Sequence, residues 1–91
     1  MAIQLKDHLY ARHRAGDVDV FYELSDVDEV VATETYAGYL NPLGGWIIIR
    51  YVVGAGITTI RYKSGKDNYS DNWNNRAALV YKLYNEMLEE I

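Results

Sequence analysis

Several side chains in this chain are of the types that bind metals or transfer protons, and their spacing decides what they can do. His8 and His13 are five residues apart, so they do not share a helix face as metal ligands at i and i+4 do. Asp17 and Asp19 open an acidic stretch, but a calcium loop needs oxygen ligands at alternate positions around a glycine turn, and Phe21 interrupts that order. The spacing therefore predicts no metal site and no cofactor.

The glycine-containing segments do not match nucleotide-binding motifs. Residues 64–66 (Ser-Gly-Lys) lack the earlier glycine and the Lys-Ser/Thr order of a phosphate loop. Residues 54–56 (Gly-Ala-Gly) precede a β-type run, whereas a dinucleotide fingerprint requires a helix there. There is also no Gly-x-Ser-x-Gly elbow, and no close pair of carboxylates sits in an apolar setting. We therefore expect a protein that is not an enzyme.

Two charged sets are suited to binding rather than to catalysis. The acids between residues 17 and 29 favour solubility and protection of an exposed edge strand, and as an alternative they would meet a basic groove on another protein. These acids are Asp17, Asp19, Asp26, Asp28 and Glu29. Bases that interleave with tyrosines are a combination that base-stacking sheets use. Here they are Arg50, Arg61, Lys63 and Lys66, with Tyr51, Tyr62 and Tyr69.

The bulk composition narrows the class of protein. The length of 91 residues predicts one domain with a modest core. The net charge of −4 argues against a dedicated DNA-binding domain, and the absence of cysteine excludes disulfides and thiolate metal sites. No apolar run approaches a membrane span, and the N-terminus lacks the apolar core of a signal peptide. We expect a protein made in the cytoplasm, with nine tyrosines placed at interfaces or at the margin of the core.

The first half of the chain alternates between short structured segments and polar breaks. Residues 1–15 form a basic arm whose pattern allows a short helix. Residues 18–24 alternate as a strand does, residues 25–28 read as a turn, and residues 30–40 predict a second strand. Residues 41–45 form the clearest loop.

A predicted hairpin follows and completes the strand region, which extends over residues 18–63. Its first strand, residues 46–53, is apolar on both faces and so should be central or covered. Centring the turn on Ala55 places Ile48 opposite Tyr62. One face then carries Trp46, Ile48, Val52, Ile60 and Tyr62. The other carries Ile47, Ile49, Tyr51 and Val53 with Thr59, Arg61 and Lys63, and it is apolar enough to require cover from the N-terminal segment or a partner subunit.

The last segment, residues 71–91, predicts an amphipathic helix that Ser70 or Asp71 can cap. Its apolar stripe recurs at spacings of four and three: Trp73, Ala77, Val80, Tyr84, Met87 and Ile91. Leu79 and Leu83 lie about 100° from this stripe and either widen the core face or make a second contact. The expected fold is α+β, a roughly four-stranded antiparallel sheet with this helix packed on one face.

Three segments between residues 32 and 81 carry a recognisable order. Ala-Thr-Glu-Thr-Tyr-Ala-Gly begins at Ala32, Trp-Ile-Ile-Ile-Arg at Trp46, and Trp-Asn-Asn-Arg-Ala-Ala-Leu-Val-Tyr at Trp73. This order resembles a family of short bacteriophage-encoded proteins that often lie near virion or tail genes. The signature residues are Trp46, Tyr62, Tyr69, Trp73, Arg76 and Tyr81. Residues 64, 66 and 67 depart from the family's acidic loop, and the resemblance implies no activity.

The leading hypothesis is a non-enzymatic phage structural or interaction module of a capsid, neck or tail. It would act through self-association or contacts with other structural proteins, in the virion or the host cytoplasm and without a membrane. The candidate contact residues are Ile47, Ile49, Tyr51, Val53, Arg61, Lys63, Leu79 and Leu83. The alternatives are a small acidic inhibitor of a host defence or transcription protein and a nucleic-acid-binding module.

Overall fold

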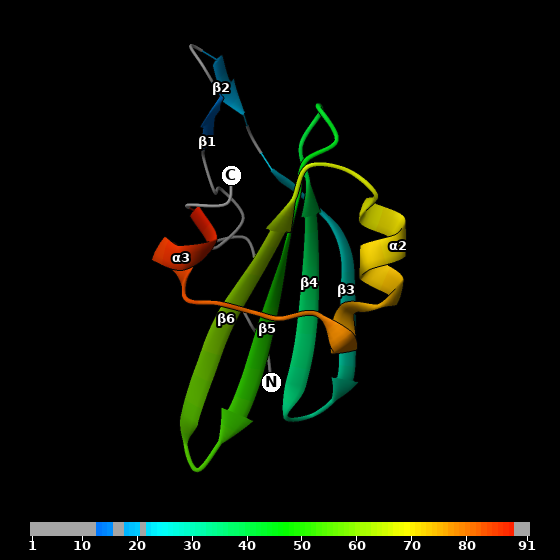
Figure 1. Ribbon diagram of the computed structural model, residues 1–91. Coiled ribbons are helices and arrows are strands. Elements are labelled where there is room, and N and C mark those ends of the chain that lie inside the picture. Colours follow the sequence, from blue (N-terminus) through cyan, green and yellow to red (C-terminus); the bar gives the residue numbers. More distant parts are fainter. Residues whose placement is uncertain (1–12, 16–17, 21, 89–91) are drawn as a thin grey trace.

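Four antiparallel strands form the main sheet of this α+β protein, and a separate pair of short strands precedes it (Figure 1). The computed structural model describes residues 13–15, 18–20 and 22–88. The short pair is β1 (His13–Ala15) and β2 (Val18–Val20). The main sheet has the order β3-β4-β5-β6, with the bounds Glu23–Val31, Glu34–Leu40, Trp46–Gly54 and Ile57–Gly65.

The N-terminal segment differs from the expected helical arm where it can be compared. Residues 13–15 form β1, which pairs with β2, so they are not helical. The remainder of the arm, residues 1–12, lies outside the described residues.

Strand β3 runs through the acidic segment where a turn was expected. The predicted break at residues 25–28 is wrong, since the chain turns only after Val31. The register with β4 is irregular between Leu24 and Asp26 and between Asp28 and Val31. Such bulges accommodate extra residues on one strand, so this polar sequence stays paired with β4. The predicted first strand is accordingly divided between β2 and β3.

A two-residue turn, Ala55 and Gly56, joins β5 to β6. Their φ angles of 53° and 77° fit a type I′ turn, whose twist matches that of the flanking strands. The predicted register is wrong by one residue, because Ile49 rather than Ile48 lies opposite Tyr62. A slip of one residue exchanges the two faces of β6 relative to β5, so its side chains lie on the faces opposite to those expected.

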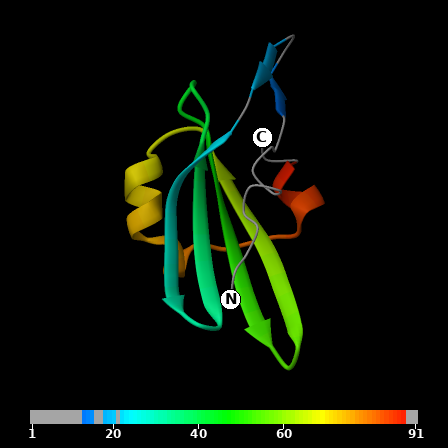
Figure 2. The ribbon, with the colours of Figure 1, turned by 180° about the vertical axis from the view of Figure 1, so that it is seen from behind.

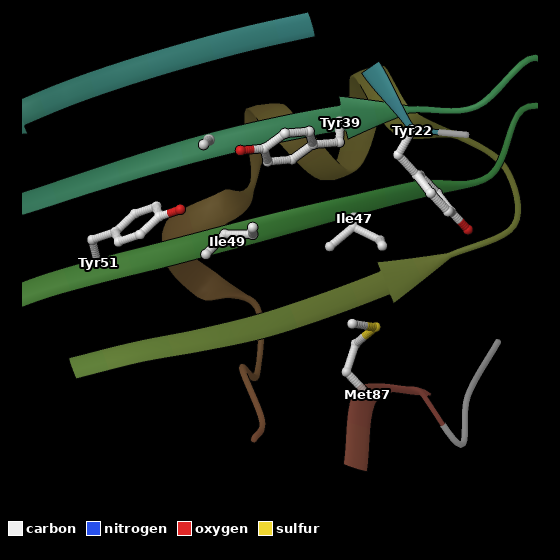
Figure 3. Close-up of a cluster of buried hydrophobic side chains, with 7 residues drawn as sticks. Tyr22, Tyr39, Ile47, Ile49, Tyr51 and Met87 are labelled. Atoms are coloured by element: carbon white, nitrogen blue, oxygen red, sulfur yellow. The ribbon is translucent and has the colours of Figure 1, made fainter. Parts of the chain in front are cut away.

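Side chains are buried on both faces of the sheet. The first core consists of Tyr22, Ala37, Tyr39, Ile47, Ile49, Tyr51 and Met87, and Figure 3 shows how they gather on one face. The second core consists of Tyr36, Trp46 and Ile48, with Leu40, Tyr69, Trp73, Leu79 and Tyr81 packed against it. Burial on both faces explains the nearly continuous apolar sequence of β5 and confirms that this strand is covered on both sides.

The C-terminal segment is helical only in short pieces. These are α2 (Tyr69–Asn74), a 3₁₀ turn η1 (Arg76–Ala78) and α3 (Tyr84–Leu88), so the single helix expected over residues 71–91 is not confirmed. Between η1 and α3 the chain crosses one face of the sheet, as Figures 1 and 2 show from opposite sides. Lys82 there forms a bridge with Tyr62 at the outer edge of β6. Asparagines at positions 72, 74 and 75 are weak helix formers and favour the break.

Candidate functional site

Aromatic rings fix the loop after β6 to the sheet. Trp46 Nε1 donates a hydrogen bond to the Asp67 carbonyl oxygen at 2.6 Å. The Tyr69 ring stacks on Trp73 with their centroids 6.1 Å apart. A Cβ added at Gly38 would collide with the Tyr69 hydroxyl, so the glycine lets α2 approach β4 closely.

Two carboxylates of β3 bind this corner from the edge of the sheet. Tyr69 Oη donates a hydrogen bond to Asp26 Oδ2 at 2.7 Å. Arg76 Nε donates to Asp28 Oδ2 at 3.0 Å, and Arg76 Nη2 forms an ion pair with the same oxygen. Both side chains of the ion pair are mostly buried, so salt screens the attraction less than at an open surface.

The Arg76 guanidinium is held on several sides. Its central carbon lies 4.5 Å from the Trp73 ring centroid and 5.7 Å from that of Tyr36, which are cation–π distances. Arg76 Nη1 donates to the Trp73 carbonyl oxygen at 2.7 Å, and Tyr81 Oη donates to the Arg76 carbonyl oxygen at 2.8 Å. Because its nitrogens are engaged within the chain, Arg76 fastens the corner to the sheet.

The signature residues divide between the two faces. The structure brings five of them together around the second core: Trp46, Tyr69, Trp73, Arg76 and Tyr81. Tyr62 instead packs against the first core and makes an edge contact with Tyr84, with the ring centroids 5.0 Å apart. The segment is therefore mainly a structural corner.

Buried or partly buried tyrosines occur on both faces of the sheet. Burial raises the pKa of Tyr39 to about 12, although a hydrogen bond with Tyr51 lowers it. Burial is also the largest cause that raises the pKa of Tyr51, Tyr69 and Tyr81. These hydroxyls stay protonated at neutral pH and are poor bases and nucleophiles. Their place in the cores accounts for much of the unusual tyrosine content.

The residues expected to contact a partner lie in different settings. Ile47, Ile49 and Tyr51 are buried in the first core, with at most 3% of each residue exposed, so a partner cannot reach them in this structure. Val53 is half-buried. Arg61 and Lys63 lie opposite Arg50 and Ile48 and therefore occupy the other face, against the prediction. Leu79 packs on the second core, and Leu83 is 47% exposed.

The acidic residues do not form one continuous patch. Asp17 lies outside the described residues, and Asp19 is in β2 opposite Arg14. Asp26 and Asp28 bind the corner described above, whereas Glu29 is exposed on β3.

The arginine and tyrosine residues of the hairpin do not form one base-stacking surface. Arg50, Arg61 and Lys63 share a face, while Tyr51 and Tyr62 lie on the opposite face in the first core. Arg50 is also paired, since its Nη2 lies 2.8 Å from Glu34 Oε2. Sequence reasoning missed this pair because it links β4 and β5, and the cross-strand register was needed to find it.

The described part of the chain contains no group of three or more His, Cys, Asp or Glu side chains that could hold a metal ion. Residues 67–71, together with Leu40 and Gly44, line a shallow open depression beside α2. Among the helices of the described ranges, none has the length and apolar character needed to cross a membrane.

Comparison with protein families, curated proteins and solved structures gives no match. The function is therefore argued from the geometry of this chain.

The described residues leave the two edges of the main sheet largely without strand partners. The outer edge of β3 pairs with no other strand among them, and the one backbone bridge that the described residues make to the outer edge of β6 is that of Lys82. Strand β3 contains four acids and no base, whereas β6 contains Arg61 and Lys63 and no acid. The candidate functional site is therefore this pair of oppositely charged edges.

Proposed function

We propose that this protein is a non-enzymatic assembly module, a bacteriophage virion component of a capsid, neck or tail. It acts through self-association or through contacts with other structural proteins. The observation that carries the proposal is that both edges of the main sheet are open over much of their length among the described residues. Unpaired strand edges are templates for pairing with another chain.

Two further features support an interaction role over catalysis. Arg76 and its two carboxylate neighbours are engaged in fastening the corner, and the buried tyrosines keep their protons. At the sheet ends, apolar side chains remain accessible, with Val31 54% exposed and Ile57 66% exposed. Exposed apolar groups beside an open edge suit a protein contact.

The proposal is tested by measuring association and location. Size-exclusion chromatography with light scattering should show species heavier than the 10.5 kDa monomer as concentration rises. Mass spectrometry of purified phage particles should detect the protein in stoichiometric amounts. A strict monomer at high concentration that is also missing from particles contradicts the proposal.

The acidic edge of β3 supports a second candidate, an inhibitor that occupies a basic groove of a host protein. Glu23 and Glu29 are exposed there and are not needed to hold the corner. A pull-down from host lysate should then recover one stoichiometric partner, which Glu29→Lys should release. Retention of that partner by the variant argues against this candidate.

A further inference from the structure

Arg50 and Arg61 lie directly opposite each other on neighbouring strands. Like charges in this position repel unless each has a counter-ion. Arg50 has one, because its Nε and Nη2 both donate to Glu34 Oε2. Arg61 donates to the Ile60 carbonyl oxygen at 2.8 Å and has no carboxylate partner among the described residues. Among the described residues, the sheet therefore presents an arginine at its β6 edge without a carboxylate partner.

The acid that Arg61 lacks is present at the other end of the same row. Cross-strand pairing places Asp28, Tyr36, Arg50 and Arg61 in one line across the four strands. Both bonds from Arg76 reach Asp28 at Oδ2, and no described donor reaches its Oδ1. Glu29 is exposed next to it. A second sheet that continued this row would bring Asp28 to Arg61, with the charge of Glu29 at the same edge.

Strand direction permits that continuation. The sheet has four strands, and every neighbouring pair is antiparallel, so β3 and β6 run in opposite directions. A second copy in the same orientation would therefore place its β3 antiparallel to β6 of the first. The pairing pattern of the sheet would extend across the contact without change.

Charge separation between the edges favours this contact over the two symmetric ones. Joining two β3 edges would oppose acids with acids, among them the exposed Glu23 and Glu29, and joining two β6 edges would oppose Arg61 with Arg61. Both arrangements carry like-charge repulsion, whereas β3 against β6 pairs opposite charges.

The bridge between Tyr62 and Lys82 decides which part of β6 is open. The Tyr62 backbone amide donates to the Lys82 carbonyl oxygen at 2.8 Å, and the Tyr62 carbonyl oxygen accepts from the Lys82 amide at 2.7 Å. Since outward-facing backbone groups alternate along a strand, Ile60 and Thr58 also face outward, and no described residue pairs with them. The open part of β6 is thus the half near the hairpin turn, level with the Val31 end of β3.

From these observations we propose that a second copy of this chain docks in the same orientation, with residues 28–31 of its β3 against residues 57–61 of β6. This inference rests on the proposed function, since it specifies the self-association surface. Asp28 of one copy meets Arg61 of the next on the same face of the extended sheet, Glu29 beside it adds negative charge at the same edge, and the exposed Val31 meets the side of β6 that carries Thr59 and Ile57. The contact is head-to-tail, so repetition builds a ring or a filament.

The contact should be weak for each pair of copies. It involves a few residues per strand, and the bulge between Asp28 and Val31 shortens the regular pairing. Such a surface falls below the roughly 1,000 Å² that a stable isolated dimer needs. Association should therefore appear at high concentration and decrease with added salt, because its ion pairs are exposed.

Charge reversal tests the proposal on the full chain by sedimentation velocity over a concentration series. Arg61→Glu makes both edges acidic, and Glu29→Lys puts a base on each edge. Each variant alone should associate at least about tenfold more weakly than wild type. Their equimolar mixture should recover association, because every contact in an alternating assembly then joins opposite charges. Lys66→Glu and Asp71→Lys, at exposed positions outside the contact, are the matched charge controls and should behave as wild type.

The outcomes separate this inference from the proposed function. Wild-type association that the variants leave unchanged, or that their mixture does not recover, overturns the docking surface alone. A wild-type chain that stays monomeric contradicts self-association itself. Stronger association of Glu29→Lys with wild type than of wild type alone points to a symmetric β3 contact and also overturns the inference. If either variant fails to give the wild-type circular dichroism spectrum, Arg61→Gln and Glu29→Gln replace the pair, and loss of association in both remains the expected result.

Discussion

Arg76 pairs with Asp28 across 48 residues of sequence and so fastens the C-terminal corner to the acidic edge strand β3. The Trp73 ring covers the guanidinium at 4.5 Å, which keeps this ion pair partly away from water. One arginine thus links the sheet edge, α2 and the start of the crossing segment. The corner is therefore expected to depend on both charges.

Asp28→Asn should lower the free energy of unfolding by about 1.5–3 kcal/mol, because it removes the charge from a largely buried, charge-assisted hydrogen bond. Urea unfolding followed by circular dichroism measures the change. Glu29→Gln is the matched control, since the exposed Glu29 should change stability by less than about 0.5 kcal/mol. Equal effects of the two substitutions would show that the Arg76–Asp28 pair does not hold the corner.

Local sequence patterns predicted those parts of the fold that local chemistry determines. The apolar run of β5 indicated a strand covered on both faces. The prediction of a loop at residues 41–45 was also correct. The Asn41 side chain stabilises this loop, because its Oδ1 accepts hydrogen bonds from the Leu43 and Gly45 amides at 2.8 and 2.9 Å. Such turns are encoded within a few residues.

The errors arose where distant residues decide the structure. The acids of β3 read as a turn because their partners, Tyr69 and Arg76, lie more than 40 residues away. The hairpin register depended on Ala55 adopting a left-handed conformation, which its residue type does not indicate. The apolar spacing of residues 71–91 fits a helix, yet Lys82 is extended and bridges Tyr62. The charged edges could be compared only once this register was known.

Alkaline pH should destabilise the protein through its buried tyrosines. Burial raises the pKa of Tyr39 from 10.0 to about 12, so the folded state holds the proton more tightly than the unfolded state does. This contribution is fully present below pH 10 and is lost as the pH rises through about 12. Unfolding by urea at a series of pH values should show stability falling above pH 10, together with the absorbance of tyrosinate. Tyr39→Phe should make the loss of stability with rising pH less steep. If the pH dependence of stability is unchanged in this variant, Tyr39 does not contribute to it.

Gly38→Ala should lower the free energy of unfolding by about 1–3 kcal/mol, because overpacking forces side chains or backbone to shift. The added methyl group would collide with the Tyr69 hydroxyl and displace α2 from β4. Gly54→Ala is the matched control, since its methyl group would meet no atom within 4 Å. Thermal unfolding followed by tryptophan fluorescence would compare the two, and similar midpoints would contradict the close approach of Tyr69 to β4.

Ala55→Asn should raise the free energy of unfolding by about 0.5–1 kcal/mol, since asparagine tolerates the left-handed region better than alanine does. Ala55 has a φ of 53° and precedes Gly56, so the substitution creates the Asn-Gly pair that type I′ turns favour. Ala55→Val should act in the opposite direction, because a β-branched residue is strained at positive φ. Urea unfolding of the three proteins should give stabilities that decrease in the order Asn, Ala, Val. Equal slopes of the unfolding free energy against urea concentration would show that the fold is unchanged. A valine variant as stable as the asparagine variant would mean that the turn does not hold this conformation, and the register that aligns Arg61 with Asp28 would then need revision.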